Sequence, residues 1–325
     1  MFQIRTDLAV EARELYKEKN KQEIPGVEVE KSEIDNEIEV TRVKIVDDQG
    51  SQIMGRPRGS YITIESRGLK SADADLKDSV SKVLAKELIA ILPKKKSLNT
   101  LIVGLGNWNV TPDALGPQVV EKILVTRHLF RLYNKSEDPS MTSVSAISPG
   151  VMGTTGIETS DIIKGIVEKT KPDFVIAIDA LASRKMERIN TTIQISTTGI
   201  SPGSGVGSSR KELNEETLGT PVVAIGVPTV VDAATMTNDT IKKVINSFKA
   251  QASEGTEFFR LLENMGDDDK YALIKEVLEP YGANVIVTTK EIDKIITDIS
   301  QIIANGLNIA LHPGIDLKDV NRYLH

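Results

Sequence analysis

Hydrophobic and polar positions follow two different patterns along this chain, and the pattern changes near residue 71. Residues 38–46 alternate between apolar and polar side chains, and the short apolar run 61–64 follows a turn rich in Gly and Pro. Alternation with a period of two is typical of strands that bury one face. The preceding residues 8–22 are rich in Glu, Lys, Ala and Leu, and they predict a polar surface helix. We therefore expect a β-rich addition over residues 27–66.

Beyond residue 71, amphipathic and continuously apolar segments alternate, which predicts helices and strands in turn. Continuous apolar runs are typical of strands buried on both faces, as in a parallel sheet that carries helices on each side. The predicted strands are 100–105, 142–148, 174–179, 191–196, 222–227 and 284–288. The predicted helices are 76–92, 113–133, 160–169, 233–248 and 291–303, with a polar helical insertion at 254–280. The expected fold class is α/β, with a mostly parallel doubly wound sheet.

Composition places the chain among ordinary globular proteins. Of its 325 residues, 40% are hydrophobic and 26% are charged, which is enough apolar material for a large core. The formal net charge of −6 provides no basic field for a nucleic-acid backbone, so we expect no direct nucleic-acid partner. The sequence has no cysteine, and no apolar run approaches the roughly 18 residues that span a bilayer. Because the N-terminus also lacks the apolar core of a signal peptide, we expect a cytoplasmic protein without membrane contact.

Two aspartates stand where an open parallel sheet gathers its chemistry. Asp113 follows the predicted strand 100–105 and a loop of Gly, Asn and Pro, and it precedes a predicted helix. Asp179 is the last residue of the apolar run 174–179. Ligands and catalytic groups collect beyond the carboxyl ends of such strands, so both carboxyls are candidates for acid–base chemistry. The alternatives are that Asp113 caps the following helix and that Asp179 accepts hydrogen bonds from a loop.

Paired carboxyls have a specific chemical use. Two carboxylates close together in a partly dry cleft cannot both ionise at low cost, so one keeps its proton while the other acts as a base. Such a pair can activate water for attack on a peptide carbonyl and can protonate the leaving nitrogen. Asp113 and Asp179 are therefore the candidate catalytic residues of a hydrolase.

Three other motifs are weaker. The glycine-rich loop from Gly104 has Asn109 in place of the third glycine of a dinucleotide-binding loop, which disfavours nucleotide binding. Residues 199–203 match the G-x-S-x-G elbow of serine hydrolases, but Pro202 has no N–H to line an oxyanion hole beside Ser201. The three histidines lack the spacing of a metal site. We therefore expect neither a cofactor nor a metal.

Longer strings that contain these residues resemble the germination protease family, whose members degrade small acid-soluble spore proteins when a spore germinates. The similarity extends over nearly the whole chain, and its segments occur in the same order. The segments are 5–13, 104–117, 148–161, 179–184, 199–207 and 226–233. The resemblance implies an atypical aspartic endopeptidase made as a zymogen, with Asp113 and Asp179 as its catalytic pair. It also implies a fold similar to that of hydrogenase-maturation endopeptidases.

The resemblance further implies a cut after an acidic residue and before a large apolar residue that is followed by Ala. Asp7, Leu8 and Ala9 have that order, which implies self-cleavage between Asp7 and Leu8. Residues 1–7 would then be a propeptide and residues 8–325 a single protease domain. We expect this terminus to be exposed and lightly tethered. The partners implied are small acid-soluble spore proteins as substrates and further copies of the chain in a tetramer, within the cytoplasm of the spore core.

An acidic residue before the cut requires a cationic subsite, because an unpaired carboxylate is costly to desolvate. Arg184 and Lys185 are the first candidates for substrate binding, followed by Arg56, Arg58 and Arg210. Two other functions stay open on the residues alone. One is a metal-dependent maturation-type endopeptidase, and the other is a non-catalytic α/β module that binds small proteins or nucleotides.

Overall fold

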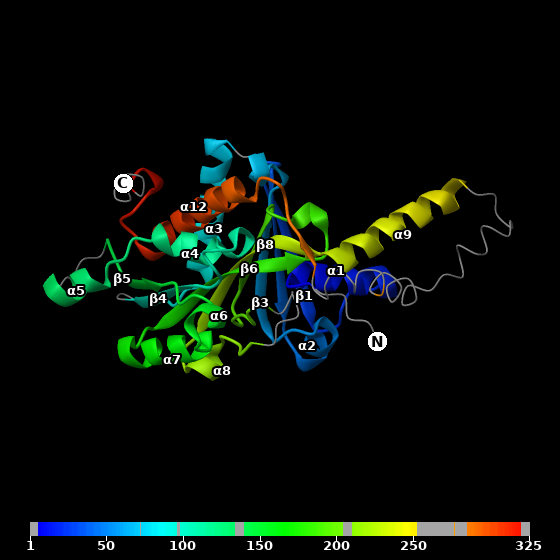
Figure 1. Cartoon of the computed structure of the whole chain (residues 1–325). Coiled ribbons are helices and arrows are strands. Elements are labelled where there is room, and N and C mark those ends of the chain that lie inside the picture. Colours follow the sequence, from blue (N-terminus) through cyan, green and yellow to red (C-terminus); the bar gives the residue numbers. More distant parts are fainter. Residues whose placement is uncertain are drawn as a thin grey trace.

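The computed structural model describes residues 6–71, 73–95, 98–133, 140–203, 210–251, 276 and 285–319. These residues form a mixed α/β structure built on one nine-stranded sheet (Figure 1). The strands are β1 (Val27–Ile34), β2 (Ile38–Ile45), β3 (Gly59–Glu65), β4 (Asn99–Gly104), β5 (Ser143–Ile147), β6 (Phe174–Ser183), β7 (Thr192–Ser196), β8 (Val222–Asp232) and β9 (Ile286–Val287). Their spatial order is β1-β2-β3-β7-β8-β6-β4-β5, and β9 pairs with the far end of β8.

Four neighbouring strands, β8, β6, β4 and β5, run parallel and form one half of the sheet. Of these, β4, β6 and β8 are apolar and buried almost throughout, as strands covered on both faces require. β6 and β8 are longer than predicted, because each continues for several residues past the apolar runs 174–179 and 222–227. The carboxyl ends of these strands carry the candidate chemistry.

The remaining strands are antiparallel, so the expectation of a mostly parallel sheet is only partly right and the sheet is mixed. β1, β2 and β3 form an antiparallel meander, β3 pairs with β7, and β7 runs antiparallel to β8. The β-rich addition 27–66 is therefore continuous with the main sheet. The composition of β7 did not reveal the direction of the strand, because a short strand buried on both faces has the same composition whether it is parallel or antiparallel.

The helices mostly follow the predicted segments. They are α1 (Ala9–Asn20), α2 (Asp48–Met54), α3 (Ala74–Ile91), α4 (Leu115–Glu121), α5 (Arg127–Tyr133), α6 (Met152–Thr155), α7 (Thr159–Thr170), α8 (Glu215–Leu218), α9 (Ala233–Gln251) and α12 (Ile292–Leu311). The predicted helix 113–133 is interrupted between α4 and α5, because the chain turns where Leu124 N–H donates to Asn308 Oδ1 at 2.9 Å. The predicted strand 284–288 is reduced to β9. The predicted insertion 254–280 lies outside the described residues, apart from residue 276.

Helices cover both faces of the parallel half of the sheet. On one face α3, α4 and α12 pack over the strands through a large apolar core that includes Leu84, Leu115 and Leu307, all fully buried (Figure 1). On the other face α7 and α8 pack against the same strands through Ile163 and Leu218. α1 and α2 pack against β2 and β3, whereas α9 extends away from the sheet. A polar side chain on β6 is consequently removed from bulk water.

Candidate active site

Asp179 lies where β6 loses one of its two neighbours. β4 ends at Gly104, which pairs with Ile178, so Asp179 is the first β6 residue without a β4 residue beside it. β6 itself continues to Ser183, which corrects the prediction that Asp179 closes the strand. The residue is only 5% exposed, and Ala180 N–H donates to its Oδ1 at 2.9 Å. Its carboxyl therefore sits in the crevice at the end of β4, largely desolvated by the sheet.

Asp113 reaches the same crevice from a tight loop after β4. It ends a single 3₁₀ turn (Thr111–Asp113), in which Asp113 N–H donates to Val110 O at 2.7 Å. Asn107 N–H donates to Asp113 O at 3.0 Å and closes the loop. Gly106 has a φ of 114°, and a Cβ there would lie 1.9 Å from Asp113 O, so this close approach requires glycine. The loop folds back over the strand end and leaves the Asp113 side chain half-buried.

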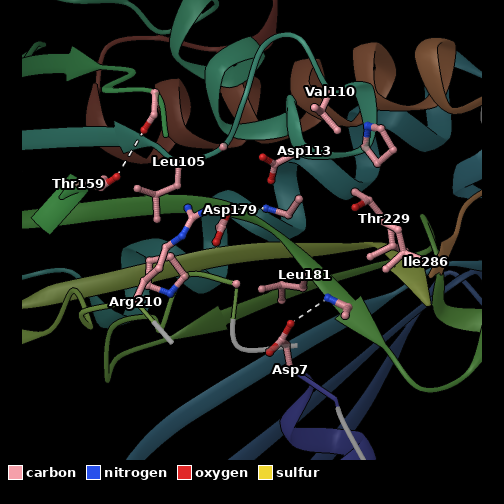
Figure 2. A pocket seen from close by; sticks show the side chains of 18 residues that line it. Asp7, Leu105, Val110, Asp113, Thr159, Asp179, Leu181, Arg210, Thr229 and Ile286 are labelled. Atoms are coloured by element: carbon pink, nitrogen blue, oxygen red, sulfur yellow. Dashed lines mark hydrogen bonds between the residues drawn. The ribbon is translucent and has the colours of Figure 1, made fainter. Parts of the chain in front are cut away.

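The two carboxyl groups share one cavity of about 240 Å³. Figure 2 shows both groups pointing into it, Asp113 from the loop after β4 and Asp179 from β6. Arg210 lines the cavity on the Asp179 side, and Asp7 lines it from the N-terminal segment. Since a water molecule occupies about 30 Å³ in the liquid, the cavity has room for several waters between these groups.

Burial raises the pKa of both aspartates. The pKa of Asp113 rises from 3.8 to about 6 because of desolvation, although Arg210 and the Asn107 N–H act in the opposite direction. The pKa of Asp179 lies well above 3.8 because of desolvation and the negative charge of Asp113, against the opposing Ala180 N–H and Arg210. Desolvation therefore favours the protonated form of both carboxyls, and the negative charge of Asp113 favours it further at Asp179. The arrangement places two carboxyl groups that can serve as a base and an acid in the wall of one cavity.

Asp113→Asn is expected to stabilise the fold at neutral pH. A carboxyl whose pKa is higher in the folded chain binds protons on folding, so the free energy of unfolding falls as pH rises from 3.8 to about 6. The amide cannot ionise and escapes this loss, which amounts to about 1–2 kcal/mol for a partly exposed group. Urea unfolding of both proteins at about pH 4 and about pH 7.5 measures the difference. An equal difference at the two pH values would contradict a raised pKa at Asp113.

The N-terminal segment, residues 6–9, lies against the cleft rather than in solvent. Asp7 N–H donates to Ala182 O at 3.0 Å, and Ala182 N–H donates to Asp7 Oδ2 at 2.8 Å (Figure 2). Leu8 is fully buried and packs in an apolar cluster with Leu181. The expectation of an exposed and lightly tethered terminus is therefore wrong from residue 6 onward. The cause is the β6 segment past the end of β4, which offers free backbone groups and apolar cover.

Two side chains hold the main chain of this segment. Gln194 Nε2 donates to Asp7 O at 3.0 Å, and Ala9 N–H donates to Gln194 Oε1 at 2.7 Å. Arg56 Nη2 donates to the carbonyl oxygen of Thr6 at 2.9 Å. Of the predicted propeptide 1–7, only residues 6 and 7 are described, and the others lie outside the described residues. Sequence reasoning missed Gln194, although an amide within the apolar run 191–196 was a signal that a buried side chain there needs polar partners.

Of the five cations predicted to bind substrate, the structure brings two to the cleft. Arg210 lines the cavity of the carboxyl pair, and Arg56 lines an adjoining groove of about 900 Å³ that Asp7 also borders. The buried Nε of Arg56 has no hydrogen-bond partner among the described residues. Burial lowers the pKa of Arg56, and the negative charge of Asp7 opposes this change. Arg56 is therefore the predicted cation that interacts electrostatically with Asp7. Arg210 instead interacts with the carboxyl pair, Asp113 and Asp179, and lowers their pKa values.

The other three predicted cations lie away from both cavities. Glu11 in the first turn of α1 accepts hydrogen bonds from Arg184 N–H at 2.7 Å and Lys185 N–H at 3.0 Å. These bonds turn the chain toward α1 directly after β6, so both side chains leave the cleft. Arg58 is exposed on the loop before β3. The ion-pair partners of Arg184, Lys185 and Arg58 are Asp239, Glu14 and Asp48, respectively.

Residues of the weaker motifs make hydrogen bonds within the fold. Ser201 Oγ donates to Glu212 Oε1 at 2.9 Å, and His312 is fully buried beside Leu124 O and Thr142 N. Over the part of the chain that the structure describes, no group of three or more His, Cys, Asp or Glu side chains is placed to hold a metal ion. No described helix is both long enough and apolar enough to cross a membrane.

A carboxyl pair whose pKa values are both raised, in a cleft at the ends of parallel strands, is typical of acid–base enzymes. The chain matches the germination protease family over residues 6–266 and 251–324. It is 55% identical over 322 residues to the germination protease of Caldanaerobacter subterraneus subsp. tengcongensis, covering 99% of this chain and 98% of that protein. Its identity to the Clostridium tetani germination protease is 52% over 322 residues, 99% of each chain. Its identity to the Bacillus cereus germination protease is 49% over 360 residues, covering 100% of this chain and 98% of that protein.

The chain therefore belongs to the germination protease family. This confirms the family inferred from the sequence strings, and it makes the protein an endopeptidase with a role in spore germination. The family name also implies that its substrates are proteins of the spore.

Proposed function

We propose that this protein is a self-processing aspartate-dependent endopeptidase that begins the degradation of small acid-soluble spore proteins at germination. Its catalytic pair is Asp113 and Asp179. It cuts after an acidic residue and before a large apolar residue that is followed by Ala, and it removes its own residues 1–7 by a cut between Asp7 and Leu8.

One observation carries this proposal: Asp113, Asp179 and Asp7 line the same cavity. The two candidate catalytic carboxyls and the acidic residue of the candidate cut site come from three separate parts of the chain. Leu8 and Ala9 follow in the order expected of a cut site, and both are buried. Leu8 packs against Leu181, which lines this cavity. The segment is held in place by main-chain hydrogen bonds of a kind that any extended peptide can form.

The raised pKa values of the pair support a division of labour between a base and an acid. Asp113, ionised above about pH 6, takes a proton from a water molecule whose oxygen forms a bond to the peptide carbonyl carbon. Asp179, whose pKa is raised well above 3.8 by burial and by the negative charge of Asp113, acts as the acid and gives its proton to the peptide nitrogen as the carbon–nitrogen bond breaks. The products are a carboxyl group and an amine. Transfer of the proton from Asp113 to Asp179 then restores the starting state, and no other reactant is consumed.

Preference for an acidic residue before the cut is supported by the surroundings of Asp7. Its carboxylate accepts a hydrogen bond from Ala182 N–H and interacts with the charge of Arg56. Preference for a large apolar residue after the cut is supported by the burial of Leu8 against Leu181. A substrate segment with Glu or Asp followed by Ile, Leu or Phe and then Ala would match the same contacts.

The partners and location follow from the family. We propose that the protein acts in the cytoplasm of the spore core as a homotetramer, without contact to membrane or nucleic acid, and that its fold is related to that of hydrogenase-maturation endopeptidases. The reaction proposed requires no cofactor. A metal-dependent maturation-type activity is the alternative that a direct experiment must separate.

The proposal is tested by incubating the purified chain with peptides that contain Glu-Ile-Ala or Glu-Phe-Ala and mapping all products by mass spectrometry. We expect a cut after Glu in each peptide and a chain that begins at Leu8. The same assay with EDTA is expected to give unchanged rates. Loss of cleavage in EDTA, with recovery on addition of a divalent cation, would favour the metal-dependent alternative.

Arg56→Gln is expected to lower the preference for Glu over Gln before the cut, by about 10-fold or more for the loss of one buried charge–charge contact. The measured quantity is the ratio of kcat/KM for two peptides that differ only in that residue. A ratio is informative because any loss of folded enzyme affects both peptides equally. Arg58→Gln is the matched control, since Arg58 is exposed and pairs with Asp48. An unchanged ratio in Arg56→Gln would remove Arg56 from the acidic subsite.

A further inference from the structure

Gln194 is a buried amide whose two polar atoms both bind the N-terminal segment. It lies in the middle of β7 and is 6% exposed. Its Nε2 donates to Asp7 O at 3.0 Å, and its Oε1 accepts from Ala9 N–H at 2.7 Å. The side chain therefore holds the main chain on both sides of Leu8.

This contact resembles the pairing of two strands. A glutamine side chain ends in an amide with one acceptor and two donors, so it can hold a backbone carbonyl and a backbone N–H at the same time. It makes these bonds without reference to the side chains of the bound segment. A contact of this kind suits a protein that must accept different peptides in one orientation.

Neighbouring groups complete the same pattern. Asp7 exchanges two hydrogen bonds with Ala182, and Arg56 holds the carbonyl oxygen of Thr6. Gly226, the β8 residue that pairs with Gln194, has no side chain, and a Cβ there would lie 2.4 Å from Leu181 Cδ1. Glycine at this position therefore allows Leu181 to lie over β8, where it packs with Leu8. Groups on β6, on β7 and on the loop before β3 thus bind the segment as an extended peptide, and Gly226 on β8 leaves room for Leu181.

We propose that Gln194 binds the carbonyl oxygen of the peptide bond to be cut and stabilises the negative charge that develops on it, in self-processing and in substrate cleavage. This inference rests on the proposed cut between Asp7 and Leu8, because that cut makes Asp7 O, the acceptor of Gln194 Nε2, the oxygen of the reacting carbonyl. Asp113 and Asp179 move protons, and Gln194 holds the oxygen on which charge accumulates.

A neutral amide is suited to this position. A buried hydrogen-bond donor aimed at the reacting oxygen is stronger than the same donor in water, because the surrounding dielectric is low. Gly226 pairs with both Gln194 and Asp179, so a lysine or arginine at position 194 would add a positive charge to that of Arg210 and lower the raised pKa of Asp179 further. After release of residues 1–7, Gln194 Nε2 loses its partner. An unpaired buried donor costs about 1–3 kcal/mol, which favours binding of a new peptide carbonyl at the same place.

The test uses the full chain with Gln194→Ala and the isosteric Gln194→Glu. Gln194→Ala is expected to lower kcat for a Glu-Ile-Ala peptide by about 10²-fold to 10³-fold, the usual effect of losing one such donor. KM is also expected to rise, because Gln194 holds two main-chain groups of the bound peptide, but by a smaller factor than kcat falls. The rate at which each chain loses its own N-terminal segment, followed by mass spectrometry, should fall in parallel.

Gln194→Glu separates this role from a structural one. At neutral pH a carboxylate cannot donate to the oxygen, so activity is expected to be low, whereas a protonated carboxyl can donate. The pH of maximal activity should therefore move to lower values in this variant. Because a buried carboxylate facing Asp7 O also lowers the melting temperature at neutral pH, kcat is measured at a temperature where circular dichroism shows the variant folded. Gln301→Ala is the matched control, since the Gln301 amide donates to Asn305 on the same helix, α12. Its kcat and pH profile should be unchanged.

The outcomes distinguish this inference from the proposed function. If either Gln194 variant folds and retains the kcat and pH profile of the unchanged chain, while Asp113→Asn and Asp179→Asn are inactive, Gln194 does not hold the reacting oxygen and the proposed function stands. If the two aspartate variants remain active, the proposed function itself is wrong. If Gln194→Ala does not fold, the pH profile of Gln194→Glu decides.

Discussion

Asp179→Asn and Asp113→Asn should each lower kcat for peptide cleavage by about 10³-fold or more, because each removes one of the two proton-transfer groups. The substitutions keep the size and shape of the side chains. Asn at position 179 cannot give a proton to the leaving nitrogen, and Asn at position 113 cannot take one from water. Removal of the chain's own N-terminal segment should stop in both variants for the same reasons.

The rates are measured with a Glu-Ile-Ala peptide, together with urea unfolding of each variant to show that it is folded. Asp173→Asn is the matched control, since Asp173 precedes the opposite, amino-terminal end of β6, where it binds Lys95 Nζ at 2.6 Å and Asn99 N–H at 2.8 Å outside the cleft. It should lose stability and keep its kcat. Cleavage at an unchanged rate by either Asp113→Asn or Asp179→Asn would end the catalytic proposal for that residue.

Gly116→Ala should lower the free energy of unfolding by about 3 kcal/mol. Gly116 is the second residue of α4, and a Cβ there would lie 2.2 Å from Leu105 O and 2.7 Å from Ile178 O. Both are backbone atoms of the strand ends that carry the two aspartates, so neither can move alone. The helix must shift, and a displacement of about 1 Å at the Asp113 loop would lower activity about 10²-fold.

Gly165→Ala provides the comparison for this prediction. Gly165 lies inside α7, and a Cβ there would meet no atom within 4 Å. Alanine is the better helix former, so this variant should gain about 0.5–1 kcal/mol. Chemical denaturation of the two variants beside the unchanged chain tests both effects. Equal stabilities for Gly116→Ala and Gly165→Ala would show that α4 does not require close contact with the strand ends.

The parts of the fold that depend on local pattern were predictable. The apolar runs 174–179 and 222–227 indicated buried strands because continuous hydrophobicity over such lengths is hard to satisfy in a surface helix. The same runs did not indicate where β6 and β8 end. Their later residues, such as those near Ala182, are held by long-range pairing with other strands and with Asp7. Strand direction in β7 also depends on which neighbours it meets, and composition does not carry that information.

The candidate site, like the fold, was predictable only where it depends on local sequence. Asp113 and Asp179 followed from one general property of parallel sheets, that chemistry collects at the carboxyl ends of strands. The supporting residues did not follow. Arg184 is five residues from Asp179, yet the hydrogen bond from its N–H to Glu11 turns it out of the cleft. Gln194 is distant in sequence from both aspartates and from the segment that it binds, so only the folded sheet brings them together.

The burial of the N-terminal segment, residues 6–9, could not be predicted from its own sequence either. A short polar stretch at a chain end normally frays, because few contacts offset its conformational entropy. Here Leu8 finds an apolar cluster and Asp7 finds free backbone groups on β6. Those groups are available because β4 ends at Gly104, a feature that no property of residues 6–9 reveals.

The central claim is that Asp113 and Asp179 form one coupled pair that retains a proton at neutral pH. Carbon-13 NMR titration of the aspartate carboxyls measures this directly, with Asp113→Asn as the second sample. The account predicts that Asp113 titrates at about pH 6, that Asp179 titrates far above 3.8, and that the pKa of Asp179 falls when Asp113 is replaced, because a neighbouring negative charge is lost. Two carboxyls that titrate near 3.8, with Asp179 indifferent to the substitution, would contradict it.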